Sequence, residues 1–182
     1  MDNALYSMRG RRVSAAQGMI TCTIAENIHQ EKDQSLARSK SGVLPAPFRT
    51  VLRGIAEEVS PELARHISSD TLLLLGLAFN LRNFHPDILF AVVVPYRLNE
   101  VIEIARNYPG VDWFEGKILA VTLTGERTEL HGALAEDNWL PGGKASLMRT
   151  IEFLDAVRRE HKIPFSAVIE KLARGNTDWI RS

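Results

Sequence analysis

The chain is poor in cysteine, and Cys22 is the only one among its 182 residues. A single thiol excludes a disulfide within the chain and any metal site built from several thiolates. It is also typical of proteins that work in a reducing compartment. No secretory signal is evident, because polar residues interrupt the segment that follows Arg12. The sequence therefore predicts a cytoplasmic protein.

Long apolar runs and net charge are also lacking. The two longest apolar runs, residues 72–79 and 88–95, are far shorter than the roughly 20 residues that a membrane-spanning helix needs. The 22 basic residues balance the 22 acidic ones, which argues against a general binder of polyanions. We therefore expect no contact with a membrane and only weak support for nucleic-acid binding.

Motifs of catalysis and of metal binding are missing as well. The five histidines lie on different segments, and no two have the spacing that places two metal ligands on one helix face. The sequence has no Gly-x-Ser-x-Gly motif, and Cys22 lies in a segment without a shaped environment for a nucleophile. We expect no cofactor, no metal ion and no catalytic residue, and we favour a protein without enzymatic activity.

What the sequence does contain is an ordinary share of hydrophobic residues, 45%, behind a polar N-terminal segment. Residues 1–43 have few bulky apolar side chains, so alone they bury too little surface to offset the entropy that ordering costs. Ser41–Pro47 contains one glycine and two prolines, which indicates a hinge. We therefore predict a flexible or partner-ordered N-terminal arm (residues 1–43) and a globular domain over residues 44–182.

The domain is predicted to be α+β and helix-rich, a single domain with a small sheet of about three strands. Apolar residues recur at helical spacing in four segments, residues 48–59, 98–105, 147–157 and 165–172. Ser60-Pro61 is an N-cap followed by proline at the first helical position, which predicts a further helix start. Residues 70–84 are apolar nearly all round and are predicted to form a central helix that ends at His85-Pro86.

Three segments are predicted to be strands. Ile88–Val94 is continuously apolar and rich in β-branched residues, as in a strand that is covered on both faces. Lys117–Thr124 and Arg127–Ala133 flank a tight turn at Gly125-Glu126. We therefore predict a hairpin over residues 118–133.

One loop indicates a ligand site. Pro141–Ser146 opens a predicted helix with two glycines and a lysine, and free backbone amides at a helix N-terminus bind anions. The spacing of a P-loop is missing, so a flexible loop explains the glycines equally well. In the functional interpretation, polar groups from neighbouring elements converge on this loop. The candidate ligand-binding residues are Tyr96, Arg97, His131, Gly142, Gly143 and Lys144.

Six apolar residues are candidates for binding a partner. Four are the larger apolar residues of the arm, and two are tryptophans, a residue type that dominates interface hot spots. The tryptophans could equally complete the core of the domain. The candidate partner-binding residues are Ile20, Ile24, Ile28, Leu36, Trp113 and Trp179.

The triplet His85-Pro86-Asp87 is similar to the loop signature of J-domain co-chaperones, where it follows a basic helix and contacts the chaperone partner. Here the preceding segment is apolar, with Arg82 as its only basic residue, and a predicted buried strand follows at once. We therefore interpret the triplet as the polar end of a helix.

Three functions remain open. The favoured one is a non-enzymatic interaction or regulatory protein that acts through protein–protein contacts, with another protein or as a homo-oligomer. The first alternative is a small-molecule or nucleotide-binding domain, or an enzyme, with its site near residues 138–144. The second is a DNA-associated regulator that uses the C-terminal helices, since residues 144–182 contain eight basic and five acidic side chains.

Overall fold

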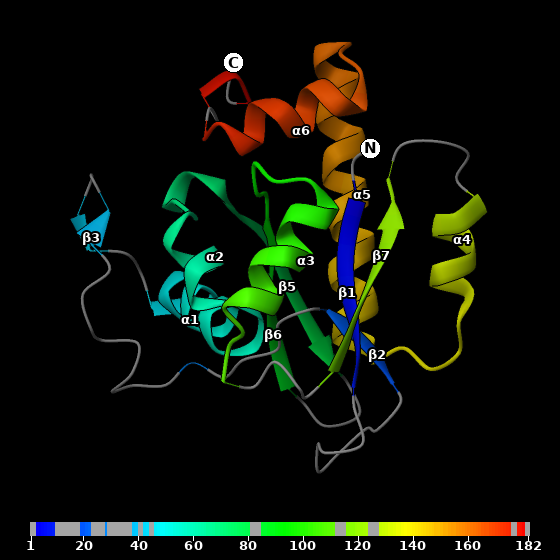
Figure 1. Ribbon diagram of the computed structural model, residues 1–182. Coiled ribbons are helices and arrows are strands. Elements are labelled where there is room, and N and C mark those ends of the chain that lie inside the picture. The colour runs from blue at the N-terminus through cyan, green and yellow to red at the C-terminus, as the bar shows by residue number, and fades with distance from the viewer. Residues whose placement is uncertain are drawn as a thin grey trace.

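The computed structural model describes residues 3–9, 19–22, 28, 38–39, 42–43, 46–80, 85–111, 116–123, 128–175 and 178–180. Its strands are β1 (Asn3–Arg9), β2 (Ile20–Cys22), β3 (Arg38–Ser39), β4 (Gly42–Val43), β5 (Leu72–Asn80), β6 (His85–Val92) and β7 (Gly116–Thr122). Its α-helices are α1 (Ala46–Gly54), α2 (Pro61–Arg65), α3 (Leu98–Asn107), α4 (Thr128–Ala135), α5 (Pro141–His161) and α6 (Phe165–Ala173). The short helical turns are η2 (Ile55–Val59), η3 (Ser69–Thr71) and η5 (Asp178–Ile180). The fold is α+β, as the sequence predicts (Figure 1).

The strands form three antiparallel sheets. The largest has the order β2-β1-β7, so that β1 pairs with β2 on one side and with β7 on the other. Tyr6, for example, lies opposite Cys22 in one pairing and opposite Leu119 in the other. Strands β5 and β6 pair with each other, and β3 pairs with β4 over two residues. Two strands of the largest sheet therefore come from the predicted N-terminal arm.

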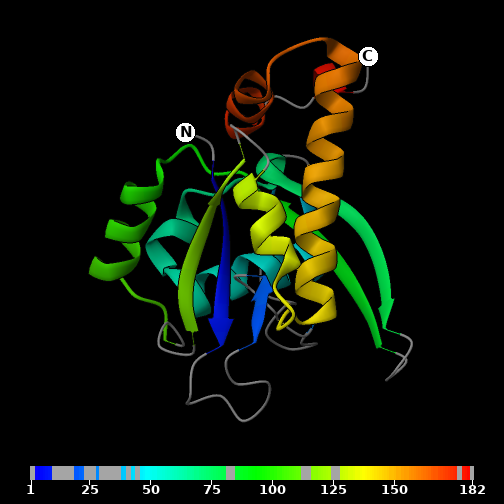
Figure 2. The same ribbon diagram turned by 90° about the vertical axis from the view of Figure 1, so that its right-hand side faces the viewer.

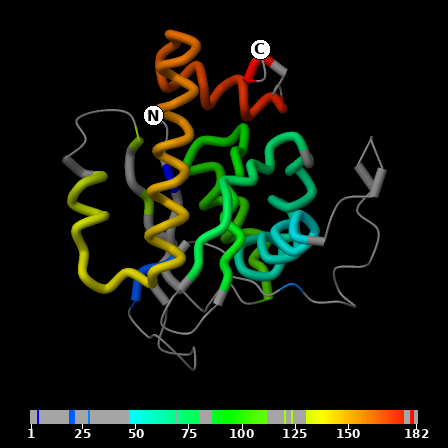
Figure 3. The backbone as a smooth tube through the Cα atoms, turned by 180° about the vertical axis from the view of Figure 1, so that it is seen from behind, coloured from blue at the N-terminus to red at the C-terminus, as the bar shows by residue number. Residues whose placement is uncertain are grey.

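Helix α5 connects the two larger sheets. It contacts β2 in the three-stranded sheet and both strands of the β5–β6 pair, which we call the β5–β6 ribbon. Figure 2 shows α5 running vertically between the ribbon and the three-stranded sheet, and Figure 3 shows α5 and the ribbon from behind. At 21 residues the helix is about 30 Å long. It is therefore long enough to pack against different elements along its length.

Three clusters of buried side chains hold these elements together. The first lies between the segment 55–72 and α3, and it consists of Ile55, Val59, Leu63, Ile67, Leu72, Val101 and Ala105. The second joins the three-stranded sheet to α4 and α5, and it consists of Ile20, Leu130, Trp139 and Leu147. The third joins α5 to α6, and it consists of Leu154, Val157, Val168 and Leu172. Because α5 contributes to two clusters, its packing couples the ends of the molecule.

The predicted helices with apolar spacing are present. The segment 48–59 begins as α1 and continues as the π-helical turn η2, and the others correspond to α3, α5 and α6. Ser60 is the predicted N-cap of α2, since its Oγ accepts a hydrogen bond from the backbone N–H of Leu63 at 3.3 Å. Pro61 takes the first helical position, as expected. No described helix is long and apolar enough to cross a membrane.

The prediction of a central helix over residues 70–84 is wrong. Leu72–Asn80 is strand β5, and His85-Pro86, the predicted helix end, lies in β6 opposite Phe79 and Asn80. A short continuous apolar run fits a strand as well as a helix. The strand here is not covered on both faces, because one face packs on α5 and the other exposes Leu74 and Leu77. Gly76 has φ +143°, which an α-helix cannot contain, and it lies at a bulge in β5. The predicted strand Ile88–Val94 corresponds to β6, which begins earlier, at His85.

The predicted hairpin over residues 118–133 is also wrong in its second half. Strand β7 covers the first segment, but Thr128–Ala135 forms helix α4. Leu130, Ala133 and Leu134 have the spacing of one helix face, and all three belong to or pack against the second cluster. Packing of this face against Ile20 and Trp139 favours the helix over the hairpin.

Part of the predicted arm lies inside the domain. Ile20 is only 4% exposed, and its backbone joins the loop before α5. Its N–H donates to the carbonyl of Asn138 at 2.8 Å, and its carbonyl accepts from the N–H of Leu140 at 2.7 Å. Ile20 of the predicted arm therefore belongs to the core of the domain.

Replacement of Ile20 tests this packing. We expect Ile20→Ala to lower the free energy of unfolding by about 2–4 kcal/mol, because it opens a cavity beside Trp139 and Leu147. Ile28 is 52% exposed, so Ile28→Ala is the matched control and should change stability by less than about 0.5 kcal/mol. Urea unfolding of both variants gives the comparison. Equal effects would contradict the assignment of Ile20 to the core.

Gly110 offers a second test of the packing around η2. A Cβ atom at Gly110 would lie 2.1 Å from the backbone oxygen of Glu57, so the backbone would have to shift. We expect Gly110→Ala to lower the free energy of unfolding by about 1–3 kcal/mol. The control is Gly132→Ala in α4, where a Cβ meets nothing within 4 Å. There the higher helix propensity of alanine should raise stability by about 0.5–1 kcal/mol, so thermal unfolding should show shifts of opposite sign.

Candidate functional site

The first turn of α5 contains the predicted anion site, and Asp87 lies against it. Pro141 occupies the first helical position, and no side chain of the preceding residue caps the helix. A Cβ atom at Gly142 would lie 2.8 Å from Oδ2 of Asp87, so this carboxylate from β6 is close to the helix N-terminus. The partial positive charge of a helix N-terminus favours a negative group there. The protein therefore places one of its own carboxylates where the sequence indicates an external anion.

The backbone amides of the predicted loop are partly used within the helix. The N–H of Lys144 donates to the carbonyl of Leu140 at 3.0 Å, and Gly143 is buried. Gly142 is half-buried beside Asp87. The loop that the sequence interprets as a phosphate cradle is therefore the first turn of a helix packed against β6.

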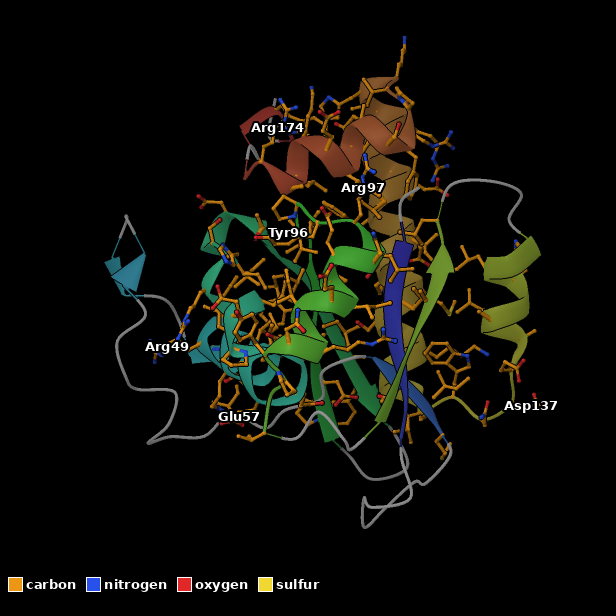
Figure 4. The ribbon with its side chains drawn as sticks, in the orientation of Figure 1. Arg49, Glu57, Tyr96, Arg97, Asp137 and Arg174 are labelled. Carbon is orange, nitrogen blue, oxygen red and sulfur yellow. The ribbon has the colours of Figure 1, made fainter. Side chains whose placement is uncertain are left out.

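The six candidate ligand-binding residues do not lie together. Tyr96 and Arg97 precede α3 and appear in the upper part of Figure 4, whereas α5 begins at the lower end of the molecule (Figure 2). The ring of Tyr96 packs edge-on against that of His66, with 5.9 Å between the centroids. The backbone N–H of Arg97 donates to Oε2 of Glu100 at 2.5 Å, which caps α3. His131 is exposed on α4. The structure thus gives most of these residues a role in local packing or capping.

A small charged cluster lies beside Tyr96. Oε1 of Glu62 is 3.2 Å from Nε2 of His66, and its Oε2 accepts from Arg65 at 2.7 Å. The hydrogen bond to His66, followed by the one to Arg65, lowers the pKa of Glu62. The three side chains lie one turn apart at the surface of α2, so they form the kind of exposed ion pairs that contribute little to stability.

Three arginines of the C-terminal segment are paired with carboxylates three or four residues away. Arg149 lies 2.7 Å from Glu152, Arg158 lies 3.4 Å from Asp155, and Arg174 pairs with Glu170. On the inner face of α6, Val168 and Leu172 are completely buried. DNA binding would have to break these pairs, so the arrangement gives the helix-turn-helix interpretation little support.

The six candidate partner-binding residues have different environments. Ile20 is in the core, and Ile28 is exposed. Trp179 packs against the third cluster, where its ring meets His161 at 4.8 Å between centroids and lies 4.5 Å from Nζ of Lys171. Trp179 therefore completes the core rather than standing free. Ile24, Leu36 and Trp113 lie outside the described residues.

The sequence does not predict an exposed apolar surface that the structure shows on β5 and β6. Leu77 is 76% exposed, and Leu74, Phe79 and Ile88 are 56%, 54% and 37% exposed. We call these four residues the outer patch. Leu77 lies opposite Ile88 in the register of the β5–β6 ribbon, Phe79 follows two residues on, and Leu74 lies opposite Phe90, so all four share one face. The helical interpretation of residues 70–84 hid this patch, because it treated them as the centre of the core.

The other face of the ribbon packs on α5. Leu89 is 5% exposed, and the Oγ of Ser146 donates to the carbonyl of Phe90 at 3.4 Å. On the outer face, Leu72 is buried in the first cluster, and Phe90 packs edge-on against Phe48 with 5.0 Å between ring centroids. The helices thus cover one end of the outer face. The far ends of β5 and β6 extend away from them (Figure 2).

Comparison with known proteins adds no assignment. No protein-family model matches the chain, and no curated protein matches its sequence. Among the described residues, no group of three His, Cys, Asp or Glu side chains is placed to hold a metal ion.

The contact between Asp87 and α5 can be tested by removing the charge. We expect Asp87→Asn to lower the free energy of unfolding by about 0.5–2 kcal/mol, since the helix N-terminus favours a carboxylate. Glu160 lies exposed near the other end of α5, so Glu160→Gln is the matched control and should leave stability unchanged or slightly raised. Urea unfolding at low and high salt measures both, and the Asp87 effect should shrink with salt. A larger loss in Glu160→Gln would contradict the dipole argument.

Proposed function

We propose that this protein is a non-enzymatic interaction or regulatory protein whose contact surface is the outer patch of the β5–β6 ribbon. The observation that carries the proposal is the exposure of Leu74, Leu77, Phe79 and Ile88 on one strand face. Contiguous exposed apolar side chains mark interaction sites, whereas scattered ones are ordinary. The proposed setting is a reducing compartment such as the cytoplasm, in keeping with a single cysteine.

The energetics support a contact at this place. Burial of a leucine or phenylalanine side chain that is otherwise in water contributes about 1.5–3 kcal/mol. Leu77, Leu74 and Phe79 each keep more than half of their surface exposed, so the folded chain leaves several kcal/mol of this stabilisation unused. A partner that covers the patch would recover it. The sequence places the contact in the arm, but the exposed apolar surface lies on a segment that the sequence assigns to the core.

A capture experiment tests the proposal. The wild-type chain and a Leu77→Lys/Phe79→Lys variant are produced with an affinity tag, beside a copy of the chain with a second tag, and the proteins that co-purify are quantified by mass spectrometry. We expect the double variant to lose at least tenfold of a co-purifying protein, either the second copy or another protein, because the lysines place charges in an apolar contact.

Val111→Lys is the control for this experiment, because Val111 is 69% exposed but lies outside the ribbon. It should retain the co-purifying protein at the wild-type level. Circular dichroism of all three chains confirms equal folding. If nothing co-purifies in a ribbon-dependent way, or if both variants behave alike, the proposed function is wrong.

A further inference from the structure

We draw no further inference here: the strongest candidate, the outer patch on the exposed face of the β5–β6 ribbon, already carries the proposed function, and nothing in the described part of the structure shows what covers it.

Discussion

The arrangement of this molecule depends on the burial of α5 along its whole length. Its first turns pack against Ile20 and Trp139, and its later turns, through Leu154 and Val157, pack against α6. Both strands of the β5–β6 ribbon also contact it. Because the three-stranded sheet, the β5–β6 ribbon and α6 all pack on this one helix, the helix fixes their relative positions. The outer patch is exposed for the same reason, since α5 covers only one face of a two-stranded ribbon.

The sequence predicts an element well where that element buries a single stripe of apolar residues. The helices α1, α3, α5 and α6 have apolar residues at regular spacing, and the serine cap of α2 has a local chemical signature. Strands β6 and β7 are also predicted. Periodicity fails for β5, because a run that is apolar at every position fits a helix as well as a strand, and the exposed face of β5 is as apolar as its covered face. It fails for α4 because the helix is short and its apolar stripe has only three positions, Leu130, Ala133 and Leu134.

The candidate site could not be predicted for a related reason. Glycines and a lysine at the start of a helix indicate an anion site, but only the tertiary structure brings Asp87 from β6 to that place. Likewise, the low apolar content of residues 1–43 predicts a segment that does not fold alone. It does not indicate where Ile20 finds its neighbours, because Trp139 and Leu147 are distant in sequence. The local sequence thus indicates which side chains need to be buried, but the residues that bury them are known only from the tertiary structure.

The pairing of β1 with β7 has a consequence for the order in which the chain becomes structured during synthesis. Tyr6 lies opposite Leu119, so β1 leaves the ribosome long before its main partner exists. Contacts between such distant positions form slowly, because a long loop must close before they are made. During most of translation β1 therefore lacks β7, its longer pairing partner. A chain that stops before β7 would leave this strand open to pairing with other chains, so premature termination should produce aggregates rather than a smaller folded protein.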